Sequence, residues 1–222
     1  MRKAGDRWQE YLRESRLAAN RSQPIGAGAY GTVYASDVPG RVMKQASYAD
    51  VNNDLEREAN MQAIAADRSM APRIAGVELF PAGIGNRIEM DDVRTNFEPH
   101  GTSSQYPTGM DAVRVNQQLG ALALRNMRLD DRHAGNIVYN KMTGRPMQLD
   151  FGIAQRVEGP DQVMVLADVT AEGFEAAGIK DMGDIYRATV YDLLEGGDVA
   201  DAMDVAKQGF SRLQKIKQGP LV

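Results

Sequence analysis

The stretch that most constrains this chain is residues 129–152, LDDRHAGNIVYNKMTGRPMQLDFG, in which two short apolar segments follow a polar loop. We expect residues 137–139 and 146–149 to pair as a β-hairpin, because the turn-forming sequence KMTG lies between them. The hairpin would place Asn136 and Asp150 side by side at its open end. The sequence therefore predicts a carboxamide and a carboxylate held together by one supersecondary unit.

A second carboxylate, Asp131, lies on the loop that leads into this hairpin, five residues before Asn136. Carboxylate and amide oxygens are ligands that Mg²⁺ prefers, and a separate carboxylate can orient an attacking hydroxyl and accept its proton. Two oxygen ligands beside a separate carboxylate are the arrangement that phosphoryl transfer needs. The alternative is a surface hairpin without a chemical role, whose Asp and Asn residues serve as turn formers and helix caps.

Composition limits the partners and the compartment. A chain of 222 residues that is 43% hydrophobic suits one domain of two lobes or two small domains. It has no Cys, which excludes disulfides and Cys-based zinc sites, and its net charge of −4 argues against nucleic acid as a partner. No apolar run predicts a membrane span or a signal peptide. We expect a cytoplasmic protein, or one delivered into a host cell by a signal-peptide-independent route.

The N-terminal region, residues 1–22, is predicted to form an amphipathic helix. Its apolar side chains Ala4, Trp8, Tyr11 and Leu12 recur at helical spacing on one stripe, with charged residues elsewhere. Such a stripe usually packs on the protein's own core. Docking of a partner protein through this helix is the alternative.

A glycine-rich segment, IGAGAYGTVY at residues 25–34, follows. Glycines without a Cβ let backbone N–H groups approach phosphate oxygens closely, and Val33 on the returning strand could cover an adenine ring. The strand-forming TVY after the glycines favours a phosphate-covering hairpin over a dinucleotide-binding turn, which needs a helix there. The candidate nucleotide-binding residues of this segment are Gly26, Ala27, Gly28, Tyr30, Gly31 and Val33.

Together these motifs resemble those of the protein-kinase-like superfamily. The resemblance covers about residues 24–196 and implies an α+β, two-lobed fold with ATP in the cleft between the lobes. It implies that Asp131 is the catalytic aspartate and that Asn136 and Asp150 hold Mg²⁺. The N-lobe is expected at residues 23–93 and the C-lobe at 111–222.

Within this resemblance, Lys44 on the strand 41–44 would contact the α- and β-phosphates of ATP. It needs a carboxylate from the following helix, expected at residues 50–66, and Glu58 matches the pairing position better than Glu56. Three apolar residues of that helix are expected to point inward: Leu55, Met61 and Ile64.

Residues 72–80 and 86–90 predict two further strands, which complete an antiparallel sheet of about five strands. The sequence that follows resembles the hinge whose backbone binds the adenine edge. Residues 94–110 are polar and are interpreted as the linker between the lobes. The hinge candidates are Met90, Asp91 and Val93.

A helix is expected from Asp111 to about Arg125, buried through Val115, Leu119 and Leu122. It leads into D-R-H-x-x-N, a form similar to the loop of phosphoinositide 3- and 4-kinases and their protein-phosphorylating relatives. His133 would supply a positive charge or a hydrogen bond to the γ-phosphate. A loop histidine without a chemical role is the alternative.

Beyond Gly152 the resemblance is to eukaryotic-like protein kinases. Ala171 and Glu172 fall where A-P-E would stand, with no expected arginine partner for the glutamate, and Asp184 would cap backbone amides of the catalytic loop. Residues 151–169 contain no Ser, Thr or Tyr, and Asp130 replaces the arginine that would bind a phosphorylated activation loop. We therefore predict activity without activation-loop phosphorylation.

After residue 197 only one helix, at about 198–216, is expected, with Ala200, Met203, Val205 and Phe210 in the core. This shortened C-lobe resembles minimal effector kinases that bacterial pathogens deliver into host cells. The sequence thus predicts an ATP- and Mg²⁺-dependent serine/threonine protein kinase, with a protein of unknown identity as substrate. The alternatives are a lipid or small-molecule kinase, a pseudokinase-like binding module, and a transferase of AMP.

Overall fold

The computed structural model describes residues 23–28, 31–46, 55–79, 86–99 and 106–216. The predicted N-terminal helix, Tyr30 in the glycine-rich turn and the beginning of the predicted helix 50–66 lie outside these residues. The chain divides into two compact units, residues 1–95 and 96–222. The fold class is α+β, as predicted: one unit is built on an antiparallel sheet and the other is mostly helical.

The first unit contains the predicted five-stranded antiparallel sheet, in the order β1-β2-β3-β5-β4. One helix, α2 (Leu55–Ala66), contacts β4 and β5. The core between them is formed by Val42, Ala46, Leu55, Ala59, Ile88 and Met90. The strands are β1 (Gly26–Gly28), β2 (Gly31–Ala35), β3 (Arg41–Ala46), β4 (Ile74–Glu78) and β5 (Arg87–Asp91).

Helix α2 buries nearly the face that the sequence predicted. Leu55 and Met61 are buried, but Ile64 is only half-buried. The next residue, Ala65, is fully buried. The buried face of α2 is therefore shifted by one residue from the predicted one at this end of the helix.

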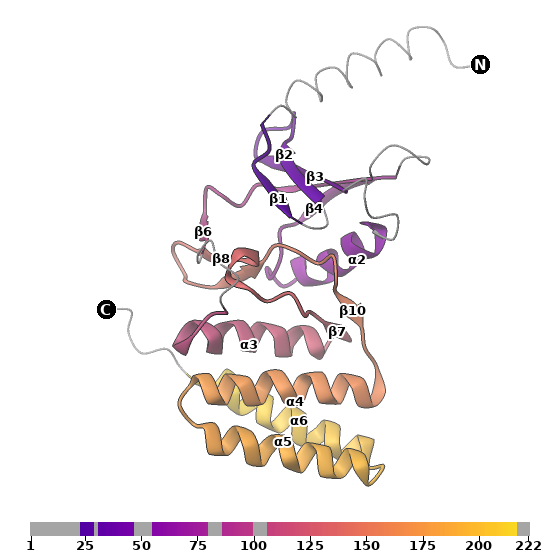
Figure 1. Cartoon of the computed structure of the whole chain (residues 1–222), viewed down its shortest axis with the longest axis vertical. Helices are drawn as coiled ribbons and strands as arrows, with labels where there is room; N and C mark the ends of the chain where they lie inside the picture. The colour runs from indigo at the N-terminus through magenta and orange to yellow at the C-terminus, as the bar shows by residue number, and fades with distance from the viewer. Residues whose placement is uncertain (1–22, 29–30, 47–54, 80–85, 100–105, 217–222) are drawn as a thin grey trace, which may run out of the picture. The chain divides into compact units, whose positions relative to one another are not determined.

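The second unit is dominated by four helices: α3 (Gly109–Ala123), α4 (Gly159–Ala176), α5 (Lys180–Glu195) and α6 (Val199–Gln214). Helix α4 lies between α3 and α5 in Figure 1 and also contacts α6. It is therefore the central helix of the unit. Its apolar face belongs to one continuous core, in which Val163, Leu166, Ala167, Ala171 and Phe174 are all buried.

Short strands complete the second unit. β6 (Phe97–Pro99), β8 (Ile137–Asn140) and β9 (Pro146–Gln148) form a three-stranded sheet, and β7 (Met127–Arg128) pairs with β10 (Gln155–Arg156). Strand β6 falls inside the predicted linker 94–110. Its three residues pair with β8, so backbone pairing includes this part of a polar segment in the second unit.

Three sequence-based expectations for these helices need correction. Helix α3 begins at Gly109, so Asp111 lies in its first turn and forms an ion pair with Arg114. Asp184 is exposed on α5, and among the described residues it caps no backbone amide of the loop at residues 129–136. In α6 the exposed Ala200 is not a core residue, whereas Ala202, Ala206, Phe210 and Leu213 are buried.

Glycines set the spacing of the four helices. A Cβ at Gly120 of α3 would overlap the ring of Phe210 on α6, and one at Gly209 of α6 would overlap the ring of Tyr186 on α5. Both aromatic side chains are at least nine-tenths buried, so neither ring has room to move away. Each glycine thus leaves the space that a large aromatic side chain of another helix fills.

We expect Gly120→Ala to lower the free energy of unfolding by about 1–2 kcal/mol, after the higher helix propensity of alanine is included. The reason is overpacking against Phe210. Chemical denaturation would measure it, with Gln208→Ala, an exposed position of α6, as the control. Equal stability of Gly120→Ala and the unmodified protein would contradict the packing described here.

Candidate active site

The predicted hairpin is present in the second unit. Strands β8 and β9 pair antiparallel, with Ile137 opposite Gln148. Beyond the last pair, the Leu149 amide donates to the carbonyl of Asn136 at 2.9 Å. This bond holds the two chain segments together at the open end of the hairpin, so that Asn136 and Asp150 leave it as neighbours.

Each of these two side chains is oriented by a local backbone contact. The Asn136 Nδ2 lies 3.5 Å from the carbonyl oxygen of Asp131, which directs its amide nitrogen toward the loop. The Asp150 Oδ1 accepts from the Gly152 amide at 3.0 Å. The site thus contains two hard oxygen donors from adjacent segments.

Asp131 and His133 contact each other on the loop before the hairpin. The His133 Nε2 lies 3.3 Å from Asp131 Oδ1, and His133 Nδ1 accepts from the Gly135 amide at 3.1 Å. Because Nδ1 is an acceptor, the ring proton of the neutral imidazole lies on Nε2 and points to the carboxylate. The structure therefore gives His133 an orienting contact with Asp131. The contact with the γ-phosphate that the sequence suggests stays a prediction.

Gly135 makes this arrangement possible. A Cβ at this position would lie 2.9 Å from Cε1 and 3.0 Å from Nδ1 of His133. The imidazole therefore packs directly on the Gly135 backbone. Sequence reasoning missed this residue, although a glycine two positions after a candidate catalytic histidine was a visible signal.

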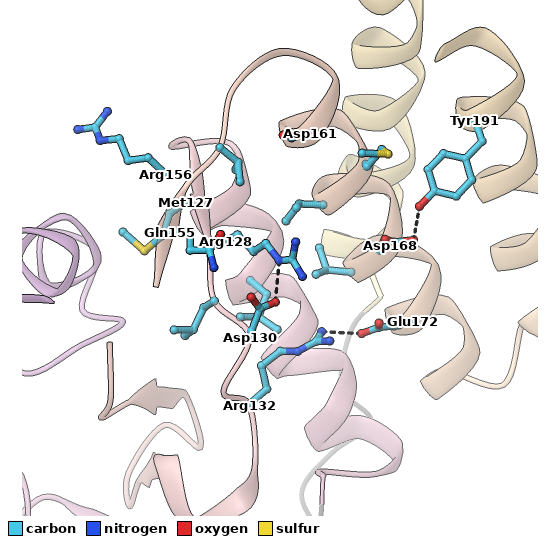
Figure 2. A pocket seen from close by; sticks show the side chains of 16 residues that line it. Met127, Arg128, Asp130, Arg132, Gln155, Arg156, Asp161, Asp168, Glu172 and Tyr191 are labelled. Carbon is cyan, nitrogen blue, oxygen red and sulfur yellow. Dashed lines mark hydrogen bonds and ion pairs between the residues drawn. The ribbon is translucent and has the colours of Figure 1, made fainter. Parts of the chain in front are cut away.

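The opposite side of the loop is tied down by two ion pairs. Arg128 Nε lies 2.7 Å from Asp130 Oδ1, and Arg132 Nη1 lies 2.7 Å from Glu172 Oε2 on α4. Glu172 therefore does have an arginine partner, contrary to expectation. Figure 2 shows both pairs at a cavity of about 330 Å³ that is bordered by the loop, the β7–β10 pair and α4.

In the first unit, Lys44 and Glu58 form a buried ion pair. Lys44 on β3 places Nζ 2.6 Å from Glu58 Oε1 on α2, with side-chain exposures of 6% and 0%. Burial of two opposite charges is favourable only when they are paired this closely. Glu56, the other glutamate of that turn, is exposed.

The glycine-rich hairpin lies across the same sheet as Lys44. In the strand register, Gly26 is opposite Val33, and Val33 is opposite Lys44. Residues directly opposite each other share a face of the sheet. A Cβ at Gly31 would collide with the carbonyl of Gln45, so this close approach of β2 and β3 requires glycine.

The hinge candidates are placed differently from one another. Met90 is buried in β5, with its sulfur 3.4 Å from Gln62 Nε2, whereas Asp91 ends the strand. The Asp91 amide donates to the carbonyl of Arg73. No residue that the structure describes accepts the amide hydrogen of Val93. Of the three, Val93 therefore offers a backbone donor.

Asp92, beside these residues, is held by Arg94 through hydrogen bonds of 2.9 and 2.6 Å. These bonds lower the pKa of Asp92 below its ordinary value, against the opposing effect of its burial. The same pairing raises the pKa of Arg94. The Asp92 carboxylate is thus committed to a structural ion pair.

Within the described ranges, no group of three or more His, Asp or Glu residues is arranged to hold a metal ion. Asn136 and Asp150 nevertheless fit Mg²⁺, because Mg²⁺ is typically held by one or two protein oxygens and completes its shell with phosphate oxygens and water. Separately, no helix in the described part of the chain has both the length and the apolar character of a membrane span.

No protein-family model and no curated protein sequence matches the chain. Solved structures do. A double mutant of the Mycobacterium tuberculosis PknI kinase domain is 16% identical, with a TM-score of 0.49, over 86% of this chain and 94% of that one. The Cydia pomonella granulovirus kinase PK-1 is 14% identical, with a TM-score of 0.48, over 73% of each chain. These likenesses are distant and assign neither an activity nor a substrate.

Proposed function

We propose that the chain is an ATP-dependent phosphotransferase that transfers the γ-phosphate to a hydroxyl group. The observation that carries this proposal is the grouping of Asp131, Asn136 and Asp150 around the open end of one hairpin. A surface hairpin with turn-forming residues has no need for a carboxylate oriented by a histidine at its entrance. The Asp131–His133 contact therefore favours a catalytic role for this loop over a surface hairpin without chemical function.

In this mechanism Asp131 is the proton acceptor. Its Oδ1 contacts His133, and the described residues offer no partner for Oδ2, which is left to accept a hydrogen bond from the acceptor hydroxyl. As the hydroxyl oxygen bonds to the γ-phosphorus and the bond to the β–γ bridging oxygen breaks, the proton passes to Asp131. Asn136 and Asp150 would hold Mg²⁺, which neutralises the phosphate charge when bound.

The first unit is assigned the remaining roles in nucleotide binding. Lys44, fixed by Glu58, would neutralise the α- and β-phosphates, and backbone amides of the glycine-rich hairpin would contact phosphate oxygens. Val33 would cover the adenine ring, and the Val93 amide would bind its edge. Gly26 and Gly31 belong to that hairpin, and a Cβ at Gly26 would meet nothing within 4 Å, which leaves space on that side.

Activity without prior phosphorylation is part of the proposal. Helix α4 begins at Gly159, so only a short connection with no hydroxyl side chain separates it from Gly152. Asp130 stands where a phosphate-binding arginine would be needed, and it is already paired with Arg128. These features support a site that does not await a phosphorylated loop.

We further propose a protein Ser/Thr as the acceptor, in keeping with the resemblance to protein kinases and, more specifically, to minimal effector kinases. One observation favours a second candidate, a lipid or small-molecule kinase. The short connection before α4 provides little chain on which an extended peptide could dock. The D-R-H-x-x-N form of the loop agrees with this candidate.

Radiolabel transfer tests the proposal. Purified protein, Mg²⁺ and γ-³²P-ATP would be incubated with a cell lysate, or with phosphoinositides and small alcohols, beside Asp150→Asn. Label on a lysate protein that is lost in the variant supports a protein kinase, and label on a lipid or alcohol supports the second candidate. Label from α-³²P-ATP would indicate AMP transfer. ATP binding without any transfer would overturn the proposal in favour of a binding module.

A further inference from the structure

The loop that bears Asp131 has two faces with different partners. Asp131 and His133 contact each other on one face. The alternate residues Asp130 and Arg132 contact Arg128 and Glu172, respectively, on the other. Figure 2 shows Asp130 and Arg132 directed toward the cavity beside α4. Arg132 is the residue between Asp131 and His133, so any displacement of its backbone moves both.

The Arg132–Glu172 pair spans a gap between the loop and α4. Two cavities, of about 330 and 520 Å³, adjoin the pair, and Leu119, Arg132 and Glu172 line both of them. The ion pair therefore borders open space in both cavities. At this point the loop is tied to α4 by a charged contact instead of by close apolar packing.

Glu172 is a fixed anchor for this contact. Its neighbours Ala171 and Gly173 are buried in α4, which packs against α3, α5 and α6. The ion pair itself is half-buried, with side-chain exposures of 27% for Arg132 and 37% for Glu172. Partial exclusion of water strengthens such a pair relative to a fully exposed one.

We propose that Arg132 and Glu172 are positioning residues, which hold the Asp131–His133 pair in its working geometry from behind the loop. Neither touches the reacting atoms. The consequence for turnover rests on the proposed phosphotransfer, but the geometric consequence does not. A displacement of about 1 Å in a catalytic group lowers a rate on the order of 100-fold. Loss of the pair is expected to lower kcat by roughly 10- to 100-fold, with little change in the KM for ATP.

Three variants and one control test this proposal. Glu172→Gln removes the charge with almost no change of shape, Arg132→Met removes the partner, and the double exchange Arg132→Glu with Glu172→Arg rebuilds the pair in reverse. The control is Arg187→Met, which breaks an ion pair of 3.1 Å to Asp168, one turn earlier on α4. We expect kcat to fall in the single variants, to recover in the double exchange, and to remain unchanged in the control.

A second measurement does not depend on activity. The chain has two histidines, so ¹⁵N NMR of a His100→Gln background reports His133 alone. In the otherwise unmodified chain we expect the tautomer protonated at Nε2, and in Glu172→Gln a mixture of tautomers because the contact with Asp131 loosens. This shift would support the positioning role even if the chain transferred no phosphate. An unchanged His133 spectrum in Glu172→Gln and Arg132→Met would overturn it, whether or not the rate changed.

Discussion

Asp131→Asn is expected to slow phosphoryl transfer by about 10²- to 10⁴-fold, the range typical of a lost general base. Asparagine has nearly the same shape and keeps an oxygen that can accept the Nε2–H of His133, so the loop should retain its geometry. What it loses is the capacity to take the proton of the acceptor hydroxyl. ATP affinity and thermal stability should therefore remain close to those of the unmodified protein.

Steady-state kinetics with γ-³²P-ATP would measure this effect, and calorimetric titration would measure ATP binding. The matched control is Asp161→Asn, a carboxylate in the first turn of α4 in the same unit. It should transfer phosphate at the unmodified rate. Equal turnover in Asp131→Asn and the control would remove Asp131 from the mechanism.

The second large effect concerns stability. Glu58→Ala is expected to lower the free energy of unfolding by about 3–5 kcal/mol, because it leaves the buried ammonium of Lys44 without its carboxylate. The double variant Lys44→Met with Glu58→Leu removes both charges and fills the space with apolar atoms. It should regain most of the lost stability but show no phosphoryl transfer, which would separate the structural role of the pair from its chemical one.

Denaturant titrations would measure both variants. Arg41→Met is the comparison, since the Arg41–Glu89 pair of 3.0 Å is partly exposed, with side chains 38% and 29% accessible. A pair of that kind contributes no more than about 1 kcal/mol. A Glu58→Ala protein as stable as Arg41→Met would mean that Lys44 finds another partner or reaches water.

The elements that sequence reasoning located are those whose signals are local. The hairpin β8–β9 follows from two apolar segments with a turn between them, and it brings Asn136 and Asp150 together without any long-range contact. The sheet follows in the same way from short apolar runs separated by turn residues. The position of Glu58 relative to Lys44 required only that a helix follow the strand.

Local signals were also present where the expectation failed. Residues 151–169 were interpreted by resemblance as an activation segment, yet α4 begins at Gly159. Gly159 has a positive φ of 57°, and Pro160 follows in the first turn of the helix, where proline is common. After Pro160 the apolar residues also recur at helical spacing, which predicts a helix. The family resemblance predicted a longer loop than the chain has, and that prediction was wrong.

The anchoring contacts are different in kind, because they join residues far apart in sequence. Arg132 and Glu172 are 40 residues apart, and nothing in either neighbourhood identifies the other as its partner. The same holds for Asp184, which was assigned a capping role from spacing alone and is exposed on α5. Spacing indicates which residues can share a turn or a hairpin, but contacts between separate elements depend on how those elements pack.

The two glycine–aromatic contacts of the helical unit should restrict which substitutions its relatives can accept. Because Gly120 is filled by Phe210 and Gly209 by Tyr186, neither member of a pair is free to change size alone. In diverging relatives of this chain, a side chain gained at position 120 should appear together with a smaller residue at 210, and likewise for 209 and 186. In an alignment, these compensated exchanges would appear as pairs of positions that change together. They would indicate the same helix spacing in sequences whose structures are unsolved.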